Sequence, residues 1–225
     1  MPASRVASEP PLYLDACATT PVVQTALQAM AEAQQQAWAN PSSLHGFGIA
    51  AAESLERSRQ RLAQLLGTTA TSVLFCSGAT ESVHLALLGA AGAAGAPGRV
   101  VISAVEHPAV AAAAGQLQRQ GWSLATLPVD GQGLVLLDRL EALLQPPTHL
   151  VSVIWGQSEV GAVQPIASIG ARCRAAGVLF HTDAVQWAPH QPIDFDQLPI
   201  DLLSLTAHKL GGPRGIGALL LRPEL

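Results

Sequence analysis

The sequence has few charged residues, and the lysines and arginines it has are scattered. Charged residues make up 12% of the 225 residues, while hydrophobic residues make up 49%. Ordinary globular chains contain roughly 25% charged residues, so we expect other protein surface, most simply a subunit interface, to cover much of this one. The formal net charge is −4, and the 12 lysines and arginines form no basic run. This charge pattern argues against a nucleic-acid-binding function.

Long apolar runs and paired cysteines are also missing. No apolar stretch reaches the ~20 uncharged residues that span a bilayer, and the start MPASRVASEP lacks the apolar core of a signal peptide. We therefore expect a cytosolic protein that does not associate with membranes. The three cysteines, Cys17, Cys76 and Cys173, lie far apart and form no CxxC pair. This spacing argues against a disulfide framework and against a metal site, and it predicts reduced thiols.

Short runs rich in Val, Ile and Leu alternate along the chain with longer runs rich in Ala, Leu and Gln. The first kind predicts strands at 73–76, 99–104, 123–129, 149–154, 177–182, 201–206 and 217–222. The second kind predicts helices at 21–38, 48–66, 80–91, 108–120, 136–145 and 165–176. This alternation predicts an α/β fold with a seven-stranded, mostly parallel sheet that helices cover on both faces.

Prolines and glycines mark some of the expected boundaries. Pro21, Pro108 and Pro165 stand where the first turn of a helix accepts proline. The stretch GAAGAAGAPG at 89–98 lies between a predicted helix and a predicted strand. We interpret it as a loop within one domain, because loops of this length are ordinary in α/β units.

Polar residues follow the predicted strands, and in an open α/β sheet ligands bind beyond the carboxyl ends of the strands. The segment SGATES at 77–82 precedes a helix, so its backbone N–H groups and Thr80 are suited to an anion such as phosphate. An ordinary turn capped by Ser or Thr is the alternative. His107 precedes the next helix, where a capping or core histidine is the alternative to a functional one.

The later strands bring an acid, an amide and a lysine to the same edge. Asp183 and Gln186 follow one strand, and Thr206, His208 and Lys209 follow the next. A buried carboxylate needs a positive partner or a structural hydrogen bond. A lysine alone there would be a solvated loop residue, but a desolvated lysine with a lowered pKa can form a Schiff base. Together these groups suit a phosphorylated aromatic aldehyde.

Eight segments in one order resemble the class V, fold-type I enzymes that use pyridoxal phosphate, and among them the cysteine desulfurases of the NifS/IscS kind. The resemblance covers nearly the whole chain. It is carried by YLDACATTP (13–21), NPSSLHGFG (40–48), SGATES (77–82), VEHPAV (105–110), LPVDGQG (127–133), SEVGAVQPI (158–166), FHTDAVQ (180–186) and AHKLGGPRGIGALLLR (207–222).

The resemblance implies a catalytic role for two residues and ring contacts for two others. Lys209 would bond covalently to pyridoxal phosphate, and His107 would stack on the pyridine ring and relay protons. Asp183 would pair with the ring nitrogen, and Gln186 would contact the phenolic oxygen. An anionic Asp183 would keep that nitrogen protonated, so that the ring can accept electrons from the substrate.

The resemblance also implies where the phosphate is held. Thr80, Thr206 and His208 would contact it with their side chains, and Ala79 with its backbone. Ser158 stands where the family has an asparagine that touches the cofactor, and its hydroxyl can hydrogen-bond over a shorter reach. It is therefore a weaker candidate for a cofactor contact.

Other positions depart from the family pattern. The family motif D-N-N-A-T-T is here Asp15 to Thr20 with Ala16 and Cys17 in place of the two asparagines. Family members continue for nearly as long again, with a small domain, an arginine for the substrate carboxylate and a loop that carries the nucleophilic cysteine. None of the three cysteines matches that nucleophile, and Cys17 is the one to test. We expect residues 1–20 to form an N-terminal segment and 21–225 the cofactor-binding large domain.

The implied activity is removal of sulfur from L-cysteine to give alanine and a persulfide for sulfur transfer or iron–sulfur cluster assembly. The implied partners are L-cysteine, a second copy of the chain, and a sulfur acceptor or iron–sulfur scaffold protein. A selenocysteine lyase and a class V transaminase are alternatives within the family. A non-catalytic fragment that binds the cofactor, or only dimerises with a longer partner, is the alternative from another class.

Overall fold

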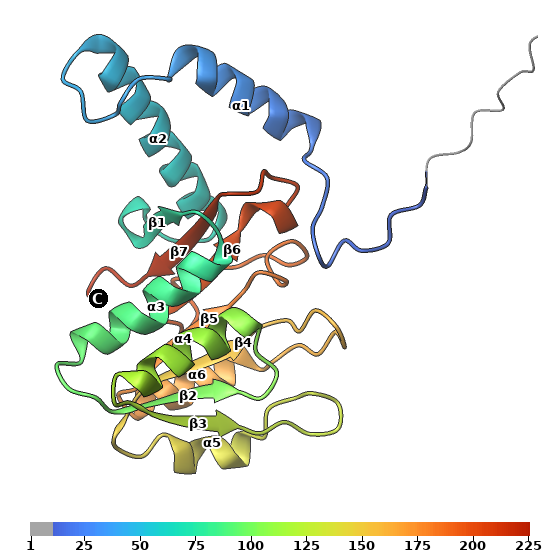
Figure 1. Cartoon of the computed structure of the whole chain (residues 1–225), viewed down its shortest axis with the longest axis vertical. Helices are drawn as coiled ribbons and strands as arrows, with labels where there is room; N and C mark the ends of the chain where they lie inside the picture. Colours follow the sequence, from blue (N-terminus) through green and yellow to red (C-terminus); the bar gives the residue numbers. More distant parts are fainter. Residues whose placement is uncertain (1–10) are drawn as a thin grey trace, which may run out of the picture.

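The computed structural model describes residues 11–225, which form an α/β fold around one seven-stranded sheet (Figure 1). The strands are β1 (Val73–Cys76), β2 (Arg99–Ser103), β3 (Ser123–Leu127), β4 (Thr148–Ile154), β5 (Leu179–Asp183), β6 (Leu202–Thr206) and β7 (Gly217–Leu221). The helices are α1 (Gln24–Gln36), α2 (Gly46–Leu65), α3 (Ala79–Ala93), α4 (Pro108–Arg119), α5 (Leu137–Leu143) and α6 (Ile166–Ala175). Two short 3₁₀ helices, η1 (Ala70–Ser72) and η2 (Ala207–Lys209), complete the described elements. All seven predicted strands and all six predicted helices are confirmed.

The sheet is mostly parallel, as predicted, with strand order β1-β7-β6-β5-β4-β2-β3. Only β7 runs against its neighbours, β1 and β6. Residues 207–216 alone join β6 to β7, which is shorter than the dozen or more residues that a parallel crossover needs. Because β7 is antiparallel to both neighbours, β1 is parallel to β6. The carboxyl ends of β1 to β6 therefore lie at one edge.

Helices cover both faces of the sheet, and alternate residues of each strand face opposite layers. Val101 and Val151 pack in the cluster that contains α5 and α6, whereas Val100, Ile102 and Leu150 pack in the cluster that contains α3 and α4. This alternation follows from the two-residue period of a strand. The central strands are apolar on both sides because helices lie over both faces.

Some details of the predicted boundaries are wrong. Pro21 lies before α1 rather than in its first turn, because Val23 is still extended and its N–H donates to Gly211 O at 2.8 Å. The predicted loop at 89–98 is helical as far as Ala93, because its alanines favour helix more than its glycines oppose it. Pro108 stands at the first turn of α4, as predicted, whereas Pro165 is the N-cap residue of α6, one position before its first turn.

Helices α1 and α2 lie at one end of the molecule (Figure 1). They leave apolar side chains exposed at the surface. Helix α1 has no buried residue. The exposed large apolar residues just before α1, on α1, on the segment after it and at the start of α2 are Val23, Leu27, Met30, Trp38, Leu44, Phe47 and Ile49. This surface agrees with the expectation of a covering partner. No helix within residues 11–225 combines the length and apolar character needed to cross a bilayer.

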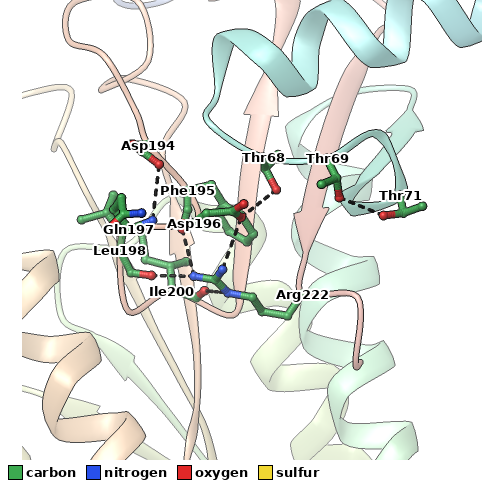
Figure 2. A network of polar contacts seen from close by, with 10 residues as sticks. All are labelled: Thr68, Thr69, Thr71, Asp194, Phe195, Asp196, Gln197, Leu198, Ile200 and Arg222. Carbon is green, nitrogen blue, oxygen red and sulfur yellow. Dashed lines mark hydrogen bonds and ion pairs between the residues drawn. The ribbon is translucent and has the colours of Figure 1, made fainter.

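The side chain of Arg222, just after β7, ties the end of the sheet to the loop before β6 (Figure 2). Its guanidinium donates to the carbonyl oxygens of Phe195, Leu198 and Ile200 at 2.9, 2.6 and 2.8 Å. It also lies 4.5 Å from the centroid of the Phe195 ring. Asp196 is a more distant partner, at 3.5 Å. The fork of N–H donors of arginine suits three carbonyls at once.

We expect Arg222→Met to lower the free energy of unfolding by about 2–4 kcal/mol, because it leaves three carbonyl groups without their charged donor. Asp196→Asn is the matched control, and we expect it to cost about 0–1 kcal/mol because that carboxylate is a half-exposed partner. Urea unfolding of both variants measures the difference. Equal losses in the two variants would contradict the importance of the carbonyl contacts.

Candidate active site

A cavity of about 790 Å³ opens at the sheet edge where the carboxyl ends of the parallel strands meet. Every residue predicted as a site residue lines it, although these residues come from five strand ends and the turns that follow. They are Ala79, Thr80, His107, Ser158, Asp183, Gln186, Thr206, His208 and Lys209. The cavity thus brings the predicted residues together, and what each of them does is a separate question.

The amino terminus of α3 forms one wall of the cavity. Gly78 is the N-cap residue, and no side chain caps the helix, so the alternative of an ordinary Ser- or Thr-capped turn is wrong. An uncapped helix start leaves backbone N–H groups for an anion. A Cβ at Gly217 would lie 2.7 Å from the Gly78 Cα. The glycine at the start of β7 therefore allows this turn to approach the sheet.

Asp183, the last residue of β5, is a buried acid that is 4% exposed and faces the cavity. Its Oδ1 accepts a hydrogen bond from the Val185 N–H at 3.0 Å. Burial raises the pKa of this carboxyl, while that hydrogen bond and the charges of His107 and Lys209 oppose the rise. Within residues 11–225 it forms no ion pair. The acid is therefore suited to a positive group that enters the cavity.

Lys209 ends the η2 turn after β6, and its Nζ faces the N-terminal segment. The amine donates to Cys17 O and, at 3.0 Å, to Ala18 O. Burial lowers the pKa of the amine, and the charges of Cys17, Asp183 and Asp15 partly offset this effect. The alternative of a freely solvated loop lysine is wrong, because the amine donates to two carbonyl groups.

The segment before α1 packs against the turn that holds Lys209. The backbone N–H and the hydroxyl of Thr20 donate to His208 O at 3.0 and 2.9 Å. Thr19 Oγ1 lies 3.1 Å from His208 Nδ1. Gln186 Nε2 donates to Cys17 O at 2.8 Å. Residues far apart in sequence thus fix one another at the cavity, and the Gln186 and Lys209 side chains share one carbonyl.

His107 serves as a helix cap and also lines the cavity. It is the N-cap residue of α4, and its Nδ1 accepts from the Ala109 N–H at 3.1 Å. The capping alternative is therefore confirmed, and it does not conflict with a functional role. Because Nδ1 is an acceptor here, a neutral imidazole carries its proton on Nε2.

Sequence reasoning missed Glu106, the neighbour of His107. Its Oε1 accepts from Ser103 Oγ at 2.5 Å and from Ile154 N at 2.7 Å, while its Oε2 is buried without a partner among the described residues. Burial raises the pKa of this carboxyl to about 8, and the nearby Asp183 adds to the rise. The signal was the same as for Asp183, since both are acids at strand ends among apolar residues.

The three cysteines have different surroundings. Cys76 lies on β1 and Cys173 within α6, as predicted. Burial raises the pKa of both thiols, that of Cys173 to about 12, which is the environment of an unreactive packed thiol. Cys17 is exposed and lines the cavity, as does Arg214, which the sequence analysis did not single out. In the described part of the chain no three His, Cys, Asp or Glu side chains are grouped as metal ligands would be.

Comparison with known proteins gives a consistent set of relatives. The model of the family described as aminotransferase class-V matches residues 12–225. The cysteine desulfurase IscS of Dictyoglomus turgidum is 38% identical over 212 residues, which are 94% of this chain and 54% of that protein. The cysteine desulfurase IscS of Neisseria meningitidis serogroup C is 41% identical over 214 residues, which are 94% of this chain and 53% of that protein. The chain therefore spans about half the length of these relatives.

Solved structures agree with the sequence comparison. A NifS-like protein superposes with a TM-score of 0.89 at 33% identity, over 93% of this chain and 58% of that one. A structure described as SspA in complex with cysteine superposes with a TM-score of 0.89 at 36% identity, over 93% of this chain and 61% of that one. These likenesses confirm the predicted fold type.

Glu106→Gln tests whether this buried carboxyl is protonated in the folded protein. The folded chain holds the proton up to about pH 8, whereas the ordinary pKa is 4.5. The free energy of unfolding of the wild type should therefore fall as pH rises between these values, because the folded state binds the extra proton there. Urea unfolding near each end of this pH range measures the fall, and we expect the free energy of unfolding of Glu106→Gln to show none.

Glu81→Gln is the matched control for this prediction. Hydrogen bonds from Ser77 lower the pKa of the exposed Glu81 carboxyl, so its contribution changes only below its ordinary pKa of 4.5. The control should keep the wild-type pH dependence above that value. An unchanged pH dependence in Glu106→Gln would show that Glu106 is ionised in the fold.

Proposed function

Because the chain belongs to the aminotransferase class-V family, we propose that it is the cofactor-binding domain of a pyridoxal-phosphate-dependent cysteine desulfurase. One observation carries the proposal: a single cavity joins the amine of Lys209, the buried acid Asp183 and the uncapped start of α3. The relatives named cysteine desulfurase IscS support the same activity. The bound cysteine named in the description of the SspA structure supports an amino-acid thiol as substrate.

The residues present fit each part of pyridoxal phosphate. A phosphate would accept from the free N–H groups at Ala79 and Thr80 and from the hydroxyl of Thr206. A pyridinium N–H would meet the carboxylate of Asp183, which is buried and has only one backbone donor. An aldehyde would lie within reach of Lys209, whose lowered pKa favours the reactive neutral amine.

His208, His107, Gln186 and Ser158 complete the proposed cofactor contacts. Burial and the charges of Lys209 and Arg214 lower the pKa of His208, so this side chain would act at the phosphate as a neutral hydrogen-bonding group. His107 would lie against the ring face while α4 holds its Nδ1. Gln186 would donate to the phenolic oxygen, and Ser158 would add a hydroxyl at the cavity rim.

When bound, the cofactor supplies a ring that withdraws electrons from the substrate α-carbon. The chain contributes the groups that hold that ring and handle the proton. An ionised Asp183 would keep the ring nitrogen protonated, and burial would strengthen this interaction. Lys209 would hold the cofactor covalently and, once released, would be the nearest amine to accept the α-proton. His107, which also lines the cavity, would relay it.

The reaction we propose converts L-cysteine to alanine and leaves the sulfur as a persulfide on a protein thiol. Among the three cysteines only Cys17 lines the cavity, so it is the one thiol within the described residues to test as that acceptor. A sulfur acceptor or iron–sulfur scaffold protein would then take the sulfur. We further propose a homodimer in the cytoplasm, with 21–225 as the cofactor-binding domain after an N-terminal segment of residues 1–20. The exposed apolar surface of α1 and α2 supports the dimer.

We expect the wild type, purified with added pyridoxal phosphate, to show a visible absorption band that borohydride abolishes. Lys209→Ala should bind the cofactor without that reducible band, because it lacks the amine that bonds to the aldehyde. Asp183→Asn should bind it more weakly, since an amide cannot neutralise a pyridinium nitrogen. Absorption spectra and dialysis measure both effects. A colourless wild type, or a reducible band that survives in Lys209→Ala, would contradict the site.

Product analysis separates the proposed activity from its alternatives. With cysteine, selenocysteine and a third amino acid as substrates, alanine and sulfide from cysteine would support the desulfurase. Turnover of selenocysteine alone would indicate a selenocysteine lyase, and amino transfer to a keto acid would indicate a transaminase. Cofactor binding without turnover, also in the presence of a full-length relative, would support the non-catalytic alternative.

A further inference from the structure

A row of four polar side chains, each fully buried, crosses the sheet just below the cavity. It contains Ser152 of β4, His181 of β5, Ser204 of β6 and Ser82 of α3, all 0% exposed. Ser152 Oγ lies 2.8 Å from His181 Nδ1, and His181 Nε2 lies 3.0 Å from Ser204 Oγ. Ser204 Oγ and Ser82 Oγ are 2.7 Å apart, and Ser82 Oγ lies 3.0 Å from the carbonyl oxygen of Ala218.

This row lies directly beneath the residues that line the cavity. Alternate side chains of a strand share a face, so Asp183 is the next residue after His181 on that face, and Thr206 is the next after Ser204. Ser204 is also the ladder partner of Asp183 on the neighbouring strand. On α3, Ser82 lies half a turn after Thr80. Movement in the row would therefore displace the cavity groups.

The carbonyl group at the end of the row fixes the direction of its hydrogen bonds. Ala218 O can only accept, so its contact with Ser82 Oγ holds a proton only when Ser82 donates its single proton there, and in that order Ser82 Oγ accepts from Ser204. Ser204 Oγ in turn accepts from His181 Nε2, and His181 Nδ1 accepts from Ser152. For a neutral imidazole, this order alone gives each of the four contacts one proton.

A doubly protonated imidazole is the other form that could complete the contacts, and burial opposes it. The ring is fully buried, and no carboxylate hydrogen-bonds to either nitrogen in the described structure. Burial alone lowers the pKa of His181 to about 3. The imidazole is thus neutral over the whole physiological range.

We infer that His181 is a positioning residue: a neutral imidazole, protonated at Nε2, whose two hydrogen bonds join β4, β5 and β6 and hold Asp183 and Thr206 at the cavity. The role of His181 in cofactor binding rests on the proposed function. Its tautomer and its hydrogen bonds are independent of that function. A neutral His181 also leaves the carboxylate of Asp183 free for a positive group in the cavity. A cation in its place would compete for that carboxylate.

The tautomer can be measured directly in the protein without cofactor. With histidine labelled with ¹⁵N, we expect His181 Nε2 to resonate as a protonated nitrogen and Nδ1 as an unprotonated one. Both signals should stay constant between about pH 5 and 8, where exposed histidines titrate. Loss of the signals in His181→Gln assigns them. A proton on Nδ1, or titration within that range, would overturn the inference.

Variants then test the positioning role. His181→Phe keeps a ring but removes both hydrogen bonds, and we expect the dissociation constant for pyridoxal phosphate to rise on the order of tenfold, as for other residues that orient ligand-binding groups. His181→Gln retains a neutral N–H for Ser204 and should restore part of the loss. The visible band of the bound cofactor should change its pH dependence in His181→Phe, because Asp183 is less well held.

Thr182→Val is the matched control, because Thr182 lies between His181 and Asp183 but faces the other side of the sheet. Its hydroxyl donates to Val153 O at 2.8 Å and is equally buried. We expect it to lower stability without changing cofactor affinity or spectrum. Equal weakening of binding in Thr182→Val and His181→Phe would reduce His181 to a structural residue and overturn the positioning role.

Two further outcomes remain informative. If His181→Phe does not fold, Ser152→Ala removes only the bond to Nδ1, and unchanged cofactor affinity and spectrum in that variant would count against the inference. If the wild type binds no pyridoxal phosphate, the proposed function fails, but the labelled histidine still decides the tautomer.

Discussion

The common direction of the parallel strands is the constraint on which the site depends. Six strands bring their carboxyl ends to one edge, and the antiparallel β7 allows β1 to join them from the far side of the sheet. The turns after five of these strands carry groups of different chemistry to a single cavity. The N-terminal segment completes the wall, since the Cys17 and Ala18 carbonyls accept from Lys209. No single segment contains the site.

The electrostatics of this edge follow from burial. Asp183, Glu106 and His181 are all enclosed by protein, where each charge is costly without a partner. Burial raises the pKa of both acids and lowers that of the histidine, so neutral forms are favoured except where a specific charge opposes them. Of these three groups, only Asp183 has neighbouring positive charges, those of Lys209 and His107, that favour its ionised form. The site is thereby prepared to hold one carboxylate against one positive group of a ligand.

Local patterns predicted most of the fold, and contacts between distant residues explain the rest. The strands were predictable because runs such as VLFC and RVVIS are apolar and bounded by turn residues. The start of α1 was not, because Val23 pairs with Gly211 O, far along the chain. The predicted site residues share one cavity because strand ends share one edge, which chain order alone indicates. The buried row around His181 was not predictable, since it depends on the register of three strands and on the position of α3.

The most direct test of the account locates the covalent bond itself. The wild-type chain would be loaded with pyridoxal phosphate, reduced with borohydride, digested, and its peptides sequenced by mass spectrometry. The account predicts a reduced phosphopyridoxyl group on Lys209 alone. Lys209 is the single lysine of the sequence, so attachment to the N-terminal amine, or no attachment at all, with Lys209 unmodified, would contradict it.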